Sequence, residues 1–201
     1  MPDDWAEFDR FLESVLIQLR LKLDPRQLSL LHQHHTLLNH WNKRMNLTAV
    51  RTIEEVVFRH FGESLALAKV IGPGVGSVVD IGSGAGFPGV PLAVACPDRH
   101  VTLVESVGKK AMFLKEIARL LPNTAVFDKR FGEFEGRVKW AIMRGVAPGE
   151  VARHVTEVAQ RMAAIVSAAK ASRAALDLGL RGAEVRQIPW DSRTVVLIGS
   201  T

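Results

Sequence analysis

A glycine-rich stretch, Asp80-Ile81-Gly82-Ser83-Gly84-Ala85-Gly86, is the part of the chain whose residue types and spacing are best suited to chemistry. It follows a run of β-branched residues and precedes a segment of helical period, which is where a doubly wound fold opens its ligand crevice. Glycines there let the backbone approach a ligand closely. The dinucleotide fingerprint G-x-G-x-x-G would need a glycine at position 87, but that residue is Phe87. The spacing therefore disfavours a pyrophosphate site.

The residues that follow, Phe87-Pro88-Gly89-Val90-Pro91, are bulky and stiffened by proline. A pyrophosphate site needs an open helix N-terminus, so this segment also argues against one. Asp80, two residues before the first glycine, instead suits a cationic ligand without phosphate. We expect the sulfonium and amino acid end of S-adenosylmethionine here. A tight strand-to-helix turn that binds nothing is the alternative.

Glu105-Ser106 ends the second expected strand, about 20 residues past the glycines. An acid at that place can accept hydrogen bonds from both hydroxyls of a ribose, which adenosyl and nicotinamide cofactors share. A solvated carboxylate at a strand end is the alternative. Lys109 and Lys110 then open a helix, where cations oppose the helix dipole unless an anion lies nearby.

The end of the fourth expected strand reads Trp140-Ala141-Ile142-Met143-Arg144 and has no Asn-Pro-Pro-Tyr type of stretch to hold an exocyclic amine. Methylation of an amino group is therefore disfavoured. The single cysteine, Cys96, is expected in the core and away from the crevice, so covalent attack on a pyrimidine ring has no nucleophile. A ring nitrogen lone pair such as guanine N7 needs alignment more than acid–base chemistry.

Histidines and basic residues of the first seventy positions are candidate ligands of a metal ion or of phosphates. His32, His34 and His35 have no carboxylate or thiolate at ligand spacing on their helix, so we predict no metal site. Several basic residues of this region either contact phosphates or are solvated at the surface: Lys43, Arg44, Arg51, Arg59 and His60.

Capping signals and hydrophobic period predict helices in residues 1–70, beginning after Asp24-Pro25-Arg26-Gln27 and after Thr52-Ile53-Glu54-Glu55. Past Gly72–Gly76, β-branched runs alternate with helical segments, which indicates βαβ units. The fold class is therefore α/β and Rossmann-like, with an N-terminal helical cap at 1–70, a ligand-binding domain at 71–201, and helices between the first five or six strands. Seven strands of a mostly parallel sheet are expected: 77–81, 100–105, 124–127, 139–143, 163–166, 184–188 and 193–198.

Composition sets outer limits on the function. Of the 201 residues, 47% are hydrophobic and 23% charged, which excludes wholesale disorder. The longest apolar runs are far shorter than the roughly 20 residues that span a bilayer, and the first residues are not basic and then apolar. With one cysteine and no disulfide partner for it, a cytoplasmic protein without a membrane partner is expected. The net charge of +5 favours an anionic partner such as nucleic acid, although many basic proteins bind none.

Taken together, several segments resemble the bacterial glucose-inhibited division protein B family. The resemblance implies a class I, S-adenosylmethionine-dependent methyltransferase that modifies guanine N7 in small-subunit ribosomal RNA. It runs from about residue 30 to residue 147, and the stretch Gly-x-Gly-x-Gly-Phe-Pro-Gly-x-Pro is its most specific part. The segments that carry it are Asn46-Leu47-Thr48, Arg59-His60, the run from Asp80 to Leu92, Glu105-Ser106 with Lys109-Lys110 and Phe113-Leu114, and Arg144-x-Val146-Ala147.

The resemblance also assigns roles to residues. It implies that Gly82 and Phe87 line the S-adenosylmethionine site, that Glu105 holds the ribose, and that Arg144 lies near both cofactor and target base. Arg144 is therefore our candidate catalytic residue, as an organiser and not as a base, because arginine stays protonated. The full cofactor-binding set that we predict is Asp80, Gly82, Gly84, Phe87, Glu105, Phe131, Gly132 and Arg144, with Phe131 and Gly132 framing the adenine.

The implied partner is small-subunit ribosomal RNA or the 30S particle, bound by a monomer that needs no metal. Glu63 stands where the family usually has Asp, Gly145 where it has Ala, and Lys170-Ala171 where it has Lys-Gly. Three other functions stay open from the sequence. They are methyl transfer to a small metabolite, a nicotinamide-dependent oxidoreductase, and a non-catalytic RNA-binding or assembly factor that keeps the fold.

Overall fold

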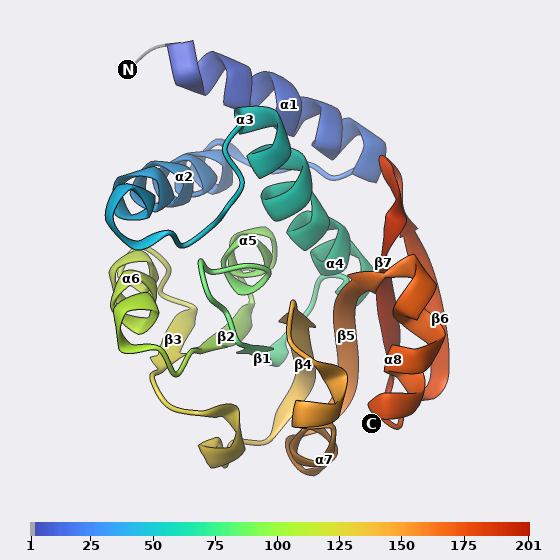
Figure 1. The fold of residues 1–201 in the computed structure, drawn as a ribbon. Helices are drawn as coiled ribbons and strands as arrows, with labels where there is room; N and C mark the ends of the chain where they lie inside the picture. Colours follow the sequence, from blue (N-terminus) through green and yellow to red (C-terminus); the bar gives the residue numbers. More distant parts are fainter. Residues whose placement is uncertain (1–2) are drawn as a thin grey trace.

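A computed structural model describes residues 3–201 of the chain, and its centre is a single seven-stranded sheet (Figure 1). The strand order is β3-β2-β1-β4-β5-β7-β6, in which β1 to β5 are parallel and β7 pairs antiparallel with both β5 and β6. The strands are β1 Gly76–Ile81, β2 Arg99–Val104, β3 Thr124–Phe127, β4 Val138–Arg144, β5 Ala159–Ser167, β6 Arg181–Ile188 and β7 Asp191–Ser200. The expected α/β, mostly parallel sheet is confirmed.

The central strands lie where the β-branched runs predict them. Val78 to Ile81 of β1 are all buried, because helices cover both faces of the sheet (Figure 1). The helices are α1 Asp3–Leu19, α2 Pro25–Met45, α3 Ile53–Glu55, α4 Glu63–Ile71, α5 Gly89–Ala95, α6 Gly108–Ala118, α7 Pro148–Val158 and α8 Ala171–Asp177. Single 3₁₀ turns, η2 Phe131–Glu133 and η3 Ala168–Lys170, complete the connections.

The predicted helix starts are confirmed in detail. The Asp24 carboxylate accepts the Gln27 backbone N–H at 2.8 Å, and the Gln27 side chain accepts the Asp24 N–H at 2.8 Å. At the second start, Thr52 Oγ1 accepts the Glu55 N–H at 3.2 Å. What the spacing does not predict is the π-helical stretch η1, Val56–Gly62, that joins α3 to α4. Such stretches occur often at functional sites.

One expected helix is missing. The segment between β3 and β4 holds only the single 3₁₀ turn η2, because it is short and contains Gly132 and Gly136. The backbone that follows β3 therefore stays near the end of the sheet, where it was predicted to frame an adenine.

The N-terminal helices share one hydrophobic core with the sheet. Leu12 of α1 and Phe61 of η1 belong to the same buried cluster as Val78 of β1 and Val101 of β2. The expected boundary at residue 70, between a helical cap and a ligand-binding domain, therefore follows a change of element type and stays a prediction. Among residues 3–201, no helix is both long enough and apolar enough to cross a membrane.

The topology fixes where a ligand crevice opens. From β1 the chain builds β2 and β3 on one side, and then returns to build β4 and β5 on the other. Ile81, the last residue of β1, is in register with Val104 of β2 and Met143 of β4. Parallel strands end at one edge, and this reversal of strand order is where doubly wound folds bind ligands. The predicted site residues that follow or end these three strands are Gly82, Glu105 and Arg144.

Candidate active site

The turn after β1 needs glycine for two different reasons. Gly82 and Gly84 have φ of +67° and +56°, in the left-handed region that glycine adopts without strain. A Cβ at position 82 would also lie 2.8 Å from Val146 Cγ2, whereas at position 84 the nearest atom would be the Gly82 carbonyl oxygen at 3.8 Å. The backbone at Gly84 is therefore open to a ligand, while Gly82 packs against the loop after β4.

Asp80 lies beneath this turn and is fully buried. Its Oδ2 accepts the backbone N–H of Gly89 at 3.0 Å, which ties the end of β1 to the start of α5. Its Oδ1 has no hydrogen-bond partner among the described residues, and burial raises the pKa of this carboxyl to about 7. Asp80 therefore shapes the turn from below, and a direct contact with a cofactor stays a prediction.

Glu105 connects the glycine turn to the next helix. Its Oε2 accepts the Gly84 N–H at 3.0 Å and its Oε1 accepts the Val107 N–H at 2.8 Å, just before α6 begins. A carboxylate has about four lone-pair sites, so each oxygen keeps one for a further donor. Its contact with a ribose stays a prediction.

The two residues predicted to frame an adenine lie in η2. The Phe131 ring is buried and packs in a T-shaped arrangement with the His154 ring, with 4.8 Å between the ring centroids. Gly132 has no atom within 4 Å of the place that a Cβ would take, so its backbone lies open.

Phe87 lies deeper than a ligand-lining residue. Its ring is stacked between those of His34 and His60, at centroid distances of 4.7 and 4.8 Å, and only 6% of the residue is exposed. It packs the helical cap onto the glycine turn. Its predicted contact with a cofactor stays a prediction.

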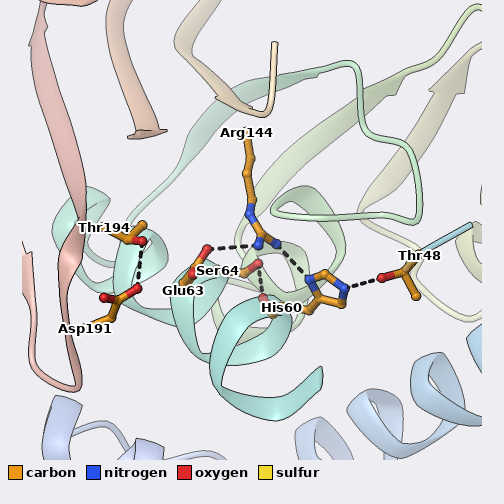
Figure 2. Close-up of polar contacts among 7 residues, drawn as sticks. All are labelled: Thr48, His60, Glu63, Ser64, Arg144, Asp191 and Thr194. Carbon is orange, nitrogen blue, oxygen red and sulfur yellow. Dashed lines mark hydrogen bonds and ion pairs between the residues drawn. The ribbon is translucent and has the colours of Figure 1, made fainter. Parts of the chain in front are cut away.

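Arg144, at the end of β4, is held by two side chains of the helix opposite (Figure 2). One guanidinium N–H donates to His60 Nδ1 at 2.9 Å, and another pairs with Glu63 Oε2 at 3.0 Å. Because a guanidinium only donates, His60 Nδ1 must accept and the ring proton is on Nε2. That nitrogen donates to Thr48 Oγ1 at 2.7 Å, so three elements converge on the arginine.

Burial controls the protonation of this cluster. Burial and the adjacent Arg144 lower the pKa of His60 to about 3, so the imidazole is neutral. Burial raises the pKa of Glu63 to about 7, although Arg144 and Arg59 both oppose the rise. The Glu63 carboxyl therefore titrates near neutral pH while the histidine does not.

The prediction that His60 is a surface residue or a phosphate contact is wrong. Only 9% of His60 is exposed, and both of its ring nitrogens are paired within the chain. The π-helical stretch η1 turns it toward Arg144, while its neighbour Arg59 is exposed, as a phosphate contact would have to be. Glu63 differs from the family's usual Asp, and no signal in the sequence predicts its pairing with Arg144.

The remaining candidates lie away from the crevice. Within residues 3–201, no three His, Cys, Asp or Glu residues are grouped so that they could hold a metal ion. Cys96 is buried directly after α5, with Sγ 3.9 Å from the Gly72 carbonyl oxygen. It is therefore part of the core, as predicted.

Comparison with solved structures identifies the class of this fold. It resembles a SAM-dependent methyltransferase from Aquifex aeolicus, with a TM-score of 0.58 and 15% identity over 72% of this chain and 92% of the other. It also resembles a fibrillarin from Aeropyrum pernix bound to S-adenosyl-L-methionine, with a TM-score of 0.56 and 14% identity over 69% and 76% of the two chains. The fold is that of the class I S-adenosylmethionine-dependent methyltransferases.

Sequence comparison then gives the family. The profile of GidB, rRNA small subunit methyltransferase G, matches residues 27–185, and the chain belongs to this family. Relatives named ribosomal RNA small subunit methyltransferase G are 50% identical over 101 residues in Roseiflexus castenholzii and over 112 residues in Xylella fastidiosa M23. The matched segments cover 50% and 55% of this chain, and about half the length of these relatives, at 43% and 52%.

Proposed function

We propose that this chain transfers a methyl group from S-adenosylmethionine to guanine N7 in small-subunit ribosomal RNA. The observation that carries the proposal is the placement of Arg144. It lies at the point where the strand order reverses, beside the glycine turn, and is held by Glu63 and His60. The family and the sequences of the relatives support this assignment.

The residues at the crevice fit S-adenosylmethionine. Gly84 and Gly132 leave backbone open where a ligand would approach, and Glu105 keeps acceptor sites for ribose hydroxyls. When bound, the cofactor supplies a methyl group on a positively charged sulfur. In this proposal Gly82, Gly84 and Glu105 hold it, the backbone at Phe131 and Gly132 frames its adenine, and Asp80 and Phe87 support the turn below.

The side chains around Arg144 are suited to alignment and not to proton transfer. N7 of guanine carries no proton, so its methylation requires no base. His60 has a pKa of about 3 and uses Nδ1 for Arg144, so it is neither an acid nor an available base at neutral pH. Holding two reactants in line is worth about 7 kcal/mol or more in favourable cases.

Arg144 has donors left for the substrate. Its guanidinium carries five N–H groups, of which Glu63 and His60 use two. Arginine commonly donates to guanine O6 and N7. A hydrogen bond to N7 would block the lone pair that must react, so we propose that Arg144 donates to O6 and leaves N7 free.

The proposed partner is small-subunit ribosomal RNA, naked or in the 30S particle, in the cytoplasm. A net charge of +5 suits such an anion, and its binding should weaken as salt rises, because bound counterions are released. In this proposal the protein works as a monomer without a metal ion.

The test is mass spectrometry of small-subunit ribosomal RNA nucleosides from cells that lack the protein and then regain it. We expect N7-methylguanosine to disappear and return with the wild type, but not with Arg144→Lys, which keeps the charge and loses the planar fork.

Purified protein should methylate ribosomal subunits or their RNA and leave free guanosine unmodified. Methylation of free guanosine alone would identify a small-molecule enzyme. Cofactor binding without turnover would identify a non-catalytic factor, and binding of NADH alone an oxidoreductase.

A further inference from the structure

A cavity of about 350 Å³ opens on the N-terminal helices, on the far side of His60 from Arg144. It lies between the end of α2 and the residues that lead into α3. We call it the Lys43–Arg51 pocket. Its lining residues are His35, Asn39, Asn42, Lys43, Thr48, Val50, Arg51, Ile53 and Val56.

The charge of this pocket is one-sided. Lys43 and Arg51 both line it, and neither side chain makes a hydrogen bond or an ion pair with any residue of the described part of the chain. None of its lining residues is acidic. Two cations without a counter-ion, on the wall of one cavity, favour an anionic ligand.

Neutral donors add to these cations. Asn42 Oδ1 accepts the Thr48 N–H at 2.9 Å, and this leaves the N–H groups of that amide without a partner among residues 3–201. Amide and cationic donors together are the groups that contact nucleic acid phosphates.

The larger cavity of the same region has the opposite character. Glu54, Glu55 and Asp191 line it together with Arg59 and Arg193, and Arg193 is paired with Asp191 at 3.4 Å. A phosphate group would meet more carboxylates than cations there. The Lys43–Arg51 pocket is therefore the better anion site of the two.

The pocket is linked to the methyl-transfer site by two hydrogen bonds. Thr48 lines it and accepts the His60 Nε2–H at 2.7 Å, and His60 Nδ1 accepts from Arg144 at 2.9 Å. Thr48 Oγ1 also accepts the Val50 N–H at 3.1 Å, which fixes the loop that forms the wall (Figure 2 shows Thr48, His60 and Arg144). A phosphate in the pocket would thus be held at a set position relative to Arg144.

From these contacts we infer that the Lys43–Arg51 pocket binds one backbone phosphate of the substrate RNA and so fixes the strand relative to Arg144. This inference rests on the proposed function, because it takes RNA as the substrate. The proposed site lies outside the cofactor crevice and binds the phosphate by its charge, whatever the base of that nucleotide is.

The test compares RNA binding by the wild type and by a Lys43→Gln/Arg51→Gln double variant. The matched control, Arg119→Gln/Arg137→Gln, removes the same charge from exposed arginines at the end of α6 and before β4. Affinity for a small-subunit RNA fragment is measured between about 50 and 200 mM salt. We expect the slope of log affinity against log salt to fall by about 1 in the double variant and to stay unchanged in the control. Calorimetry with S-adenosylmethionine should give the same affinity for all three proteins.

Three results would overturn the inference. The first is an unchanged salt slope in the double variant, and the second is an equal fall of the slope in the control variant. The third is that the double variant loses binding to adenosine monophosphate but keeps the salt slope of the wild type for RNA, which would make the pocket a free-nucleotide site. Failure of the proposed function is distinguishable from these results. In that case the wild type would transfer no methyl group to RNA, whatever the slopes of log affinity against log salt are.

Discussion

Arg144 is held between an anion and a neutral acceptor, and this combination fixes both its position and its direction. Glu63 supplies the charge and His60 supplies a directed lone pair. Glu63 already balances the charge of Arg144, so a second anion in place of the histidine would give the cluster a net negative charge beside the base. A low histidine pKa is thus a requirement of the arrangement, and burial beside two arginines produces it.

Glu63 should make methyl transfer depend on pH. Because burial raises its pKa to about 7, acidification through neutrality protonates it and releases Arg144. We expect activity to rise with pH around 7 in the wild type, to keep that rise in Glu63→Asp, and to be about 100-fold lower and flat in Glu63→Gln. Initial rates from pH 6 to 8, roughly the range over which such a group titrates, would show this. An unchanged inflection in Glu63→Gln would assign it to another group.

The raised pKa of Glu63 affects stability in the opposite direction to activity: the free energy of unfolding should fall as pH rises. The pKa of Glu63 is higher in the folded chain than its ordinary value of 4.5, so the folded state binds more protons between pH 4.5 and about 7. Relative to Glu63→Gln, the wild type should therefore lose free energy of unfolding as pH rises through that window. Urea denaturation of both proteins at several pH values measures the difference.

At the scale of elements, the turn from β1 to α5 is shaped by atoms that approach each other closely. At position 82 the positive φ and the nearby Val146 both exclude a side chain. We expect Gly82→Val to abolish S-adenosylmethionine binding, because the backbone must move to accept the new Cβ. Calorimetry is the measurement, with circular dichroism to check the fold. Unchanged affinity would remove the turn from the cofactor site.

Two glycines at the starts of helices provide a matched pair. A Cβ at Gly89 would lie 2.5 Å from Asp80 Oδ2, whereas at Gly108 it would meet nothing within 4 Å. We expect Gly89→Ala to destabilise the chain by about 1–3 kcal/mol, the usual cost of overpacking a core. Gly108→Ala should be neutral or stabilising by up to about 1 kcal/mol. Thermal unfolding of the two variants is the measurement, and equal changes of Tm relative to the wild type would contradict the prediction.

At the scale of the whole molecule, the N-terminal helices and the sheet share one of the two hydrophobic clusters of the described residues, where the sequence suggested a cap and a separate domain. Buried residues of α1 and η1 pack in the cluster that covers one face of the sheet. We therefore expect a fragment of residues 71–201 to lack cooperative thermal unfolding, because its sheet would expose the surface that Leu12, Phe61 and Leu65 now cover. A sharp transition in that fragment would show instead that the boundary at residue 70 separates two folding units.

Several features could be predicted from the sequence because they depend on neighbouring residues. The Asp24 and Thr52 caps, the buried strand ending at Ile81 and the glycine turn after it are all local patterns. The family resemblance further implied that Arg144 lies near a cofactor held by Gly82 and Glu105, and parallel strands do bring the ends of β1, β2 and β4 to one edge. The missing helix before β4 shows the limit of the same reasoning, since alternation alone does not give the length of a connection.

Only the tertiary structure showed what holds Arg144. Glu63 and His60 lie on a helix far from β4 in the sequence, and their side chains reach the arginine because the π-helical stretch η1 packs over the end of the sheet. No periodicity in the sequence reports that packing, and His60 was expected near solvent for this reason. Its burial, its tautomer and the high pKa of Glu63 are properties of the assembled core, because desolvation exists only after distant segments have come together.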